Sequence, residues 1–139
     1  FHVAQTTLED EVKFLKQNAG KRRKNFEHNY AILADGKVVG GCGIKIDQHR
    51  THIGEIGYFL DEQYWGQGIT AKAVKLLERV GFDILGLKRI VILVNPKHPA
   101  SQRVAIKNGY KKEGLMKKAH RCGRHQNEYQ TCFLYAKVQ

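Results

Sequence analysis

Cysteine is scarce in this sequence and follows no regular spacing. The 139 residues hold three cysteines, Cys42, Cys122 and Cys132. An odd number without a repeated interval argues against a disulfide framework and favours a reducing compartment, so we expect a cytoplasmic protein. No apolar run approaches the roughly 18 residues of a membrane-spanning helix, and the start lacks the basic and apolar segments of a signal peptide. We therefore expect no membrane partner.

Proline is equally rare, with only Pro96 and Pro99 in one short stretch. No linker, low-complexity tract or internal repeat divides the chain, and its length fits one domain with one hydrophobic core. We therefore interpret residues 1–139 as a single domain. The sequence begins at Phe1 rather than at Met, which leaves room for residues upstream.

Acidic residues are outnumbered by basic ones, 13 against 24, which gives a formal net charge of +11. A basic surface attracts nucleic acid, an anionic membrane or a phosphorylated cofactor, and charge alone does not choose among them. The basic stretch 111–125 is interpreted as a solvated face or as a contact for ribosomal RNA, a nascent particle or cofactor phosphates, although it shows no nucleic-acid motif. Within it, His120, Cys122 and His125 lack a fourth ligand, so no metal site is predicted.

Hydrophobic periodicity predicts alternating helices and strands along the chain. Asp35-Gly36 is a strong signal for a hairpin turn, and Asn108-Gly109 is a helix stop. The basic tract 21–24 is solvated loop or helix. The predicted elements are a helix over 7–17, strands over 30–33, 38–46 and 52–60, a helix over 70–82, a strand over 90–94 covered on both faces, a helix over 101–107, and strands over 110–117 and 128–137.

The segment Gly66-Gln67-Gly68 lies between a predicted strand and a predicted helix. Glycines let the backbone approach an anion, and the first amides of a helix have no internal partner, so they can donate to phosphate oxygens. The helix dipole adds a favourable field. The spacing matches neither the dinucleotide fingerprint nor the P-loop. Taken alone, the three residues favour an ordinary glycine turn over a phosphate-binding loop.

The longer segment 60–70 resembles the cofactor loop of the GNAT superfamily of N-acetyltransferases, most closely the branch that acetylates the N-termini of ribosomal proteins. In that branch the loop follows a strand Glu-Ile-Gly-Tyr, which stands here at 55–58. A second motif of the superfamily is similar to residues 101–110. The resemblance covers about 30–135, and two motifs in the right order are far more specific than either alone.

The resemblance implies an α/β (α+β) fold of the acyl-CoA N-acyltransferase type, with a mixed, mostly antiparallel sheet of about six strands flanked by helices. The family's additional strand before the first helix is not evident in this sequence. The loop departs from the superfamily pattern at Trp65 and at Thr70, whose hydroxyl is a candidate helix cap or phosphate contact. The resemblance implies these contacts to acetyl-CoA: the backbone of Phe59 and Leu60, the amides of Gly66, Gln67, Gly68, Ile69 and Thr70, and the side chains of Asn95 and His98.

The resemblance also implies roles in the chemistry. Glu55 occupies a position where the family often has a glutamate that acts as a base through a water; the alternative is a surface glutamate. Many members carry a tyrosine acid at the position of Ala105, so that acid is missing here. Ser101 is the candidate acid, or donor to the leaving thiolate, unless it is an ordinary serine of a helix start. We expect the oxyanion to accept from a strand amide near Phe59.

We therefore expect an acetyl-CoA-dependent N-acetyltransferase in which a primary amine attacks the thioester directly in a ternary complex. The favoured acceptor is a protein N-terminal amine, such as that of a ribosomal protein, with the enzyme a monomer or homodimer and ribosome association open. One alternative is an acetyltransferase of a small amine, either a polyamine or an aminoglycoside. The excess of basic residues argues weakly against this alternative. Another is a non-catalytic RNA- or ribosome-binding module on the same fold.

Overall fold

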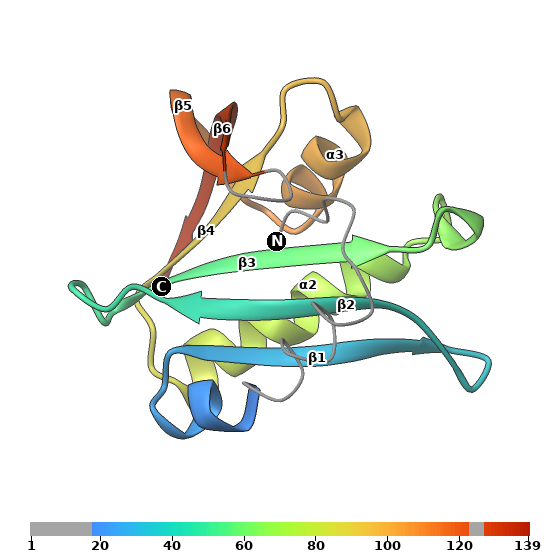
Figure 1. The fold of residues 1–139 in the computed structure, drawn as a ribbon, viewed down its shortest axis with the longest axis horizontal. Coiled ribbons are helices and arrows are strands. Elements are labelled where there is room, and N and C mark those ends of the chain that lie inside the picture. Colours follow the sequence, from blue (N-terminus) through green and yellow to red (C-terminus); the bar gives the residue numbers. More distant parts are fainter. Residues whose placement is uncertain (1–17, 123–126) are drawn as a thin grey trace.

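The computed structural model describes residues 18–122 and 127–139, and Figure 1 shows them as a curved sheet with helices packed on it. The predicted helix over 7–17, His125 and the side chain of Cys122 lie outside the described part. Residues 18–23 are helical, so the basic tract begins in a helix. The further elements are β1 (Glu27–Ala34), β2 (Lys37–Ile46), β3 (Ile53–Leu60), η1 (Glu62–Tyr64), α2 (Ile69–Arg79), η2 (Val80–Ile84), β4 (Arg89–Val94), α3 (Pro99–Lys107), β5 (Lys111–Cys122) and β6 (Glu128–Val138).

The described strands form one six-stranded sheet in the order β1-β2-β3-β4-β6-β5. Every neighbouring pair is antiparallel except β3 and β4, which run parallel. The mixed, mostly antiparallel sheet of six strands is therefore confirmed. The predicted hairpin joins β1 and β2, with Asp35 at φ 51° and Gly36 at φ 76°. Two successive positive φ angles match the twist of a two-residue hairpin, which explains the Asp-Gly sequence.

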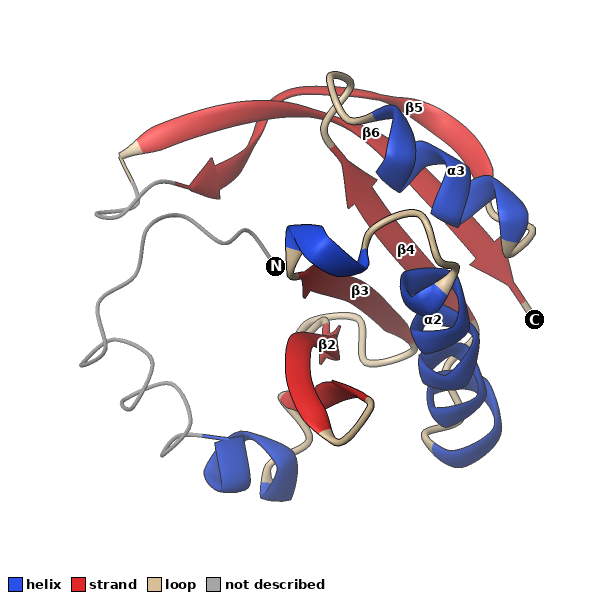
Figure 2. Ribbon diagram, turned by 90° about the vertical axis from the view of Figure 1, so that its right-hand side faces the viewer, coloured by secondary structure: helices blue, strands red, loops and turns tan. Residues whose placement is uncertain are grey.

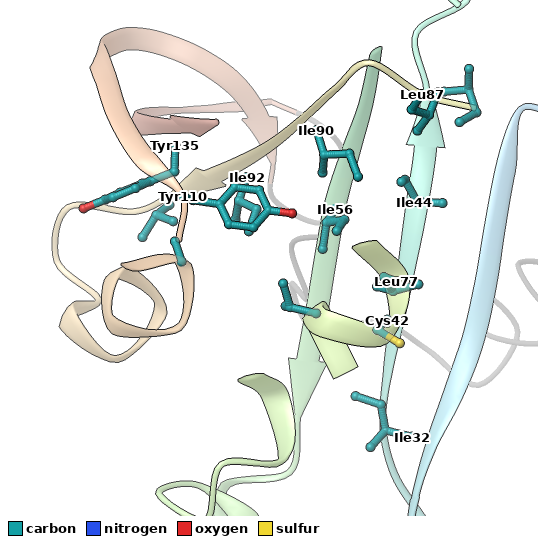
Figure 3. Close-up of a cluster of buried hydrophobic side chains, with 14 of the residues drawn as sticks. Ile32, Cys42, Ile44, Ile56, Leu77, Leu87, Ile90, Ile92, Tyr110 and Tyr135 are labelled. Carbon is teal, nitrogen blue, oxygen red and sulfur yellow. The ribbon is translucent and has the colours of Figure 1, made fainter. Parts of the chain in front are cut away.

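Helices α2 and α3 cover one face of the sheet (Figure 2). Figure 3 shows the core beneath them, where aliphatic side chains from β2, β3 and β4 meet Leu77 of α2. Tyr110 is buried in this core. In β4 the prediction of burial on both faces is wrong: Ile90, Ile92 and Val94 are buried, but the alternate residues are only half-buried. Those residues face away from the two helices.

The helix boundaries differ from the predicted ones for local reasons. Helix α2 begins at Ile69, and after Arg79 it widens into the π-helical turn η2. The wider turn brings Gly81 against the sheet so closely that an added Cβ would lie 2.7 Å from Ile90 Cδ1. Helix α3 begins at Pro99, two residues earlier than predicted, because proline suits the first helical position. It ends at Asn108-Gly109 as predicted.

Candidate active site

The parallel strands β3 and β4 are paired over only a short stretch. The paired residues are Ile53 with Arg89, Gly54 with Ile90, and Glu55 with Val91. Beyond them the two strands diverge, as Figure 1 shows, so none of the described strands lies on the β4 side of residues 56–60. The two parallel strands are thus splayed apart beyond Glu55. We call this opening the fork.

The register of β3 decides which backbone groups face the fork. Hydrogen bonding alternates along an antiparallel pair, so the backbone N–H and C=O groups of successive residues in β3 point toward β2 and toward β4 in turn. At the end of β3, the Asp61 amide donates to the Val39 carbonyl at 2.7 Å, which places the groups of Asp61 on the β2 side. By the same alternation Phe59 faces β2, whereas Tyr58 and Leu60 face the fork. The register favours Tyr58 and Leu60 over Phe59 for contacts to a ligand there.

Glu55 is the last residue of β3 that pairs with β4, so it lies at the apex of the fork. Its neighbour Ile56 is buried beneath the helices, so the half-buried Glu55 side chain lies on the opposite face of the sheet. There it lines a hollow of about 560 Å³. The hollow lies within the roughly 300–1,000 Å³ range of small ligand sites. A carboxylate therefore stands where the fork and the hollow meet.

The glycine loop has the geometry of an anion site. Gly66 and Gly68 both have φ 77°, a left-handed conformation that glycine adopts without strain. Gly68 is the N-cap of α2, and no side chain caps the helix, so the Thr70 hydroxyl does not take that role. The amides of residues 66–71 donate to no other described residue. The indole of Trp65 donates from Nε1 to the Leu60 carbonyl at 2.8 Å and so ties the loop to the end of β3.

A lysine that the sequence reasoning missed stands beside this loop. Lys107, at the end of α3, places its Nζ 4.0 Å from the Cβ position of Gly68. The side-chain amide of Asn108 donates to the Ala71 carbonyl at 3.2 Å and to the Val104 carbonyl at 3.0 Å, which holds the end of α3 against the start of α2. The Asn108-Gly109 stop fixes where α3 ends but gives no sign that it ends beside the loop.

Ser101 lies across the fork from β3. The Tyr58 hydroxyl donates to the Ser101 carbonyl at 3.4 Å, so a side chain from β3 reaches the first turn of α3. Burial raises the pKa of Tyr58 above its ordinary value, and the bond to Ser101 only partly offsets that rise. Ala105, in the position of the family's tyrosine acid, is fully buried.

Asn95 and His98 lie in the turn between β4 and α3, on the opposite arm of the fork. The Asn95 side-chain oxygen accepts from the Lys97 amide at 2.9 Å, and its carbonyl accepts from the His98 amide at 2.9 Å. His98 is the N-cap of α3, with an exposed side chain that makes no capping bond. Both residues therefore lie just beyond the C-terminal end of β4.

Two further observations concern residues 18–122 and 127–139. Within these ranges no three histidine, cysteine or acidic side chains lie close enough together to hold a metal ion. None of the helices there is both long and apolar enough to span a membrane.

A mixed sheet that forks between two parallel strands, with a glycine turn at the start of the adjoining helix, defines the acyl-CoA N-acyltransferase architecture. Residues 2–111 match the family model of the acetyltransferase (GNAT) domain. The chain belongs to the GNAT family of acetyltransferases, enzymes that take their acetyl group from acetyl-CoA.

Three relatives show how near this similarity is. The ribosomal-protein-serine acetyltransferase of Escherichia coli (strain K12) is 28% identical over 130 residues, which cover 94% of this chain and 71% of that protein. A probable N-acetyltransferase of Bacillus subtilis (strain 168) is 32% identical over 115 residues, 81% of this chain and 64% of the relative. The solved structure of a ribosomal L7/L12 alpha-N-protein acetyltransferase in complex with coenzyme A has a TM-score of 0.81 at 26% identity, covering 96% of this chain and 73% of that one.

Proposed function

We propose that this protein transfers the acetyl group of acetyl-CoA to the N-terminal amine of a protein, such as a ribosomal protein. The position of Glu55 carries the proposal, because its carboxylate lies at the apex of the fork on the face opposite α2 and α3. A thioester that enters from the helix side and an amine that arrives from the hollow would meet beside it. The similarity to a ribosomal-protein-serine acetyltransferase supports a protein terminus as the acceptor.

The helix side of the fork fits acetyl-CoA. The unpaired amides of residues 66–71 and the dipole of α2 favour a pyrophosphate, and Lys107 adds a positive charge beside them. We assign the pantetheine arm to the backbone groups of Tyr58 and Leu60, of which the Leu60 carbonyl already accepts from Trp65. The remaining contacts that we propose are on the opposite arm of the fork, at Asn95 and His98.

Glu55 supplies the base for the attack. An α-amine has a pKa of about 8, so most of it is protonated at neutral pH and must lose a proton before it can react. Glu55 takes that proton through a water, and the amide of Tyr58 donates to the thioester oxygen as negative charge develops there. Holding both reactants in one complex lowers the barrier further, because the reaction becomes effectively unimolecular.

Ser101 and Tyr58 stabilise the leaving thiolate without giving up a proton. A thiol has a pKa of about 8.5, well below that of a phenol or an alcohol. The pKa of Tyr58 is raised further by burial, so full transfer from either hydroxyl would be unfavourable. We assign the Ser101 hydroxyl a hydrogen bond to the thiolate. Tyr58 positions Ser101 through its bond to the Ser101 carbonyl.

Calorimetric titration with acetyl-CoA, followed by turnover of N-terminal peptides, tests the proposal. We expect Glu55→Gln to bind acetyl-CoA as the wild type does and to lose roughly 100-fold or more in kcat, the usual contribution of a positioned base. Glu128→Gln, an exposed acid on β6, is the matched control and should be unaffected.

Each other outcome points to a different conclusion. Turnover of Glu55→Gln that equals the wild type at every pH would remove Glu55 as the base. If the wild type fails to bind acetyl-CoA at hundreds of micromolar, the non-catalytic RNA-binding alternative stands in place of the enzyme. Faster acetylation of spermidine or an aminoglycoside than of any peptide would assign the protein to small amines.

A further inference from the structure

Lys45 and Glu55 face each other across β2 and β3. They are direct partners in the antiparallel register, so their side chains share the face of the sheet that points away from α2 and α3. The Cβ atoms of such partners are about 5 Å apart. Opposite charges this close commonly pair, yet neither residue makes an ion pair or side-chain hydrogen bond with any described residue. Among the described residues, an ammonium and a carboxylate that lack a partner therefore stand side by side. The carboxylate of Glu27, which faces Lys45 from β1, is paired with Lys21 at 3.4 Å.

The other charges around the hollow are neutralised in place. Arg50 donates from Nε and Nη2 to Asp47 Oδ2, at 3.1 and 3.0 Å. Arg89 donates from Nη1 to Glu113 Oε2 at 3.0 Å. Among the described residues that line the hollow, Lys45 and Glu55 are thus the two charged residues that have no partner. The apolar part of the lining is Ile46, Ile53, Val91, Leu93, Met116 and Leu134.

We infer that the acceptor carries a carboxylate close to its reacting amine, and we expect a peptide whose first or second residue is acidic. The inference rests on the proposed function, which places the amine at Glu55. With the amine there, the nearest free charge is the Lys45 ammonium, which attracts a carboxylate and repels a second amine. Consecutive Cα atoms are 3.8 Å apart, so an acidic side chain within two residues of the terminus reaches Lys45.

A charge-reversal experiment tests this selectivity. Peptides that differ only at the second residue, aspartate, asparagine or lysine, are compared by kcat/KM with acetyl-CoA as donor. We expect the kcat/KM of the wild type to be roughly three- to ten-fold higher for the aspartate peptide than for the lysine peptide. This is the size of effect expected of one partly exposed charge pair. Lys45→Glu should reverse the order, and Lys45→Gln should remove it. Lys37→Glu, at the exposed start of the same strand, should keep the wild-type order.

The outcomes separate this inference from the function on which it rests. Equal rates for the three peptides in the wild type, or the same order in Lys45→Glu as in the wild type, would overturn the role of Lys45. Free aspartate is included as a further acceptor. If it is acetylated and no peptide is, the charge selectivity stands but the protein terminus does not. If spermidine is the preferred acceptor, both are overturned.

Discussion

Replacing Gly68 with alanine separates a cost to folding from a cost to cofactor binding. Gly68 has φ 77°, and the nearest atom to an added Cβ is Lys107 Nζ at 4.0 Å, so the methyl group meets no obstacle. The cost to folding is then the strain of a left-handed alanine, about 1–2 kcal/mol. For a domain of 139 residues this corresponds to a decrease in Tm of roughly 3–10 °C.

Gly36 provides a matched control in the turn between β1 and β2. Its φ is 76°, and an added Cβ would have nothing within 4 Å. Gly36→Ala should therefore lower the Tm by a similar amount, although this turn is remote from the glycine loop. A thermal melt of both variants establishes that the two substitutions carry the same strain.

The affinity for acetyl-CoA should distinguish the two variants. The methyl group at Gly68 stands on the surface that a phosphate must approach, and relief of its strain would turn the adjoining amides. One lost hydrogen bond to a charged group costs about 1.5–3 kcal/mol, or roughly 10- to 150-fold in Kd. Calorimetry should show a loss of that size for Gly68→Ala and less than about two-fold for Gly36→Ala. Equal affinities in the two variants would refute the assignment of the loop amides to the cofactor.

Two further predictions concern single charges. Calorimetry should show that Lys107→Gln weakens acetyl-CoA binding several-fold, and the loss should shrink as salt is added because the cation is exposed. Lys75, an exposed lysine further along α2, provides the control. An equal loss of affinity in Lys75→Gln would count against a specific contact of Lys107. The hydrogen bond and charge of Arg89 lower the pKa of Glu113 in the folded protein. The ionised Glu113 therefore stabilises the fold at pH values above its ordinary pKa of about 4.3. This stabilisation is lost as the pH falls through the lowered pKa. The difference in Tm between the wild type and Glu113→Gln should accordingly shrink as pH falls below about 4, and a difference that stays constant with pH would contradict the assignment.

The amino-acid sequence alone determined the order of the elements and the local turns. Alternation of apolar residues marked the strands, Asp35-Gly36 marked the hairpin, and Asn108-Gly109 marked the end of α3. These features depend on neighbours a few residues apart, which is why a single sequence reveals them. The two glycines before α2 are a local signal of the same kind. The boundary errors arose where packing against the sheet intervened, as at the π-helical turn around Gly81.

Only the tertiary structure decided what surrounds those motifs. The pleat of β3 puts the Tyr58 side chain on the face that α2 and α3 cover, where its hydroxyl meets the carbonyl of Ser101, 43 positions along the chain. Asn108 holds the end of α3 against the start of α2 across 37 positions, and so brings Lys107 to the glycine loop. No periodicity or spacing encodes such contacts, because they depend on how strands and helices pack. The sequence thus identified the family and its loops, whereas the fold determined which charges stand beside them.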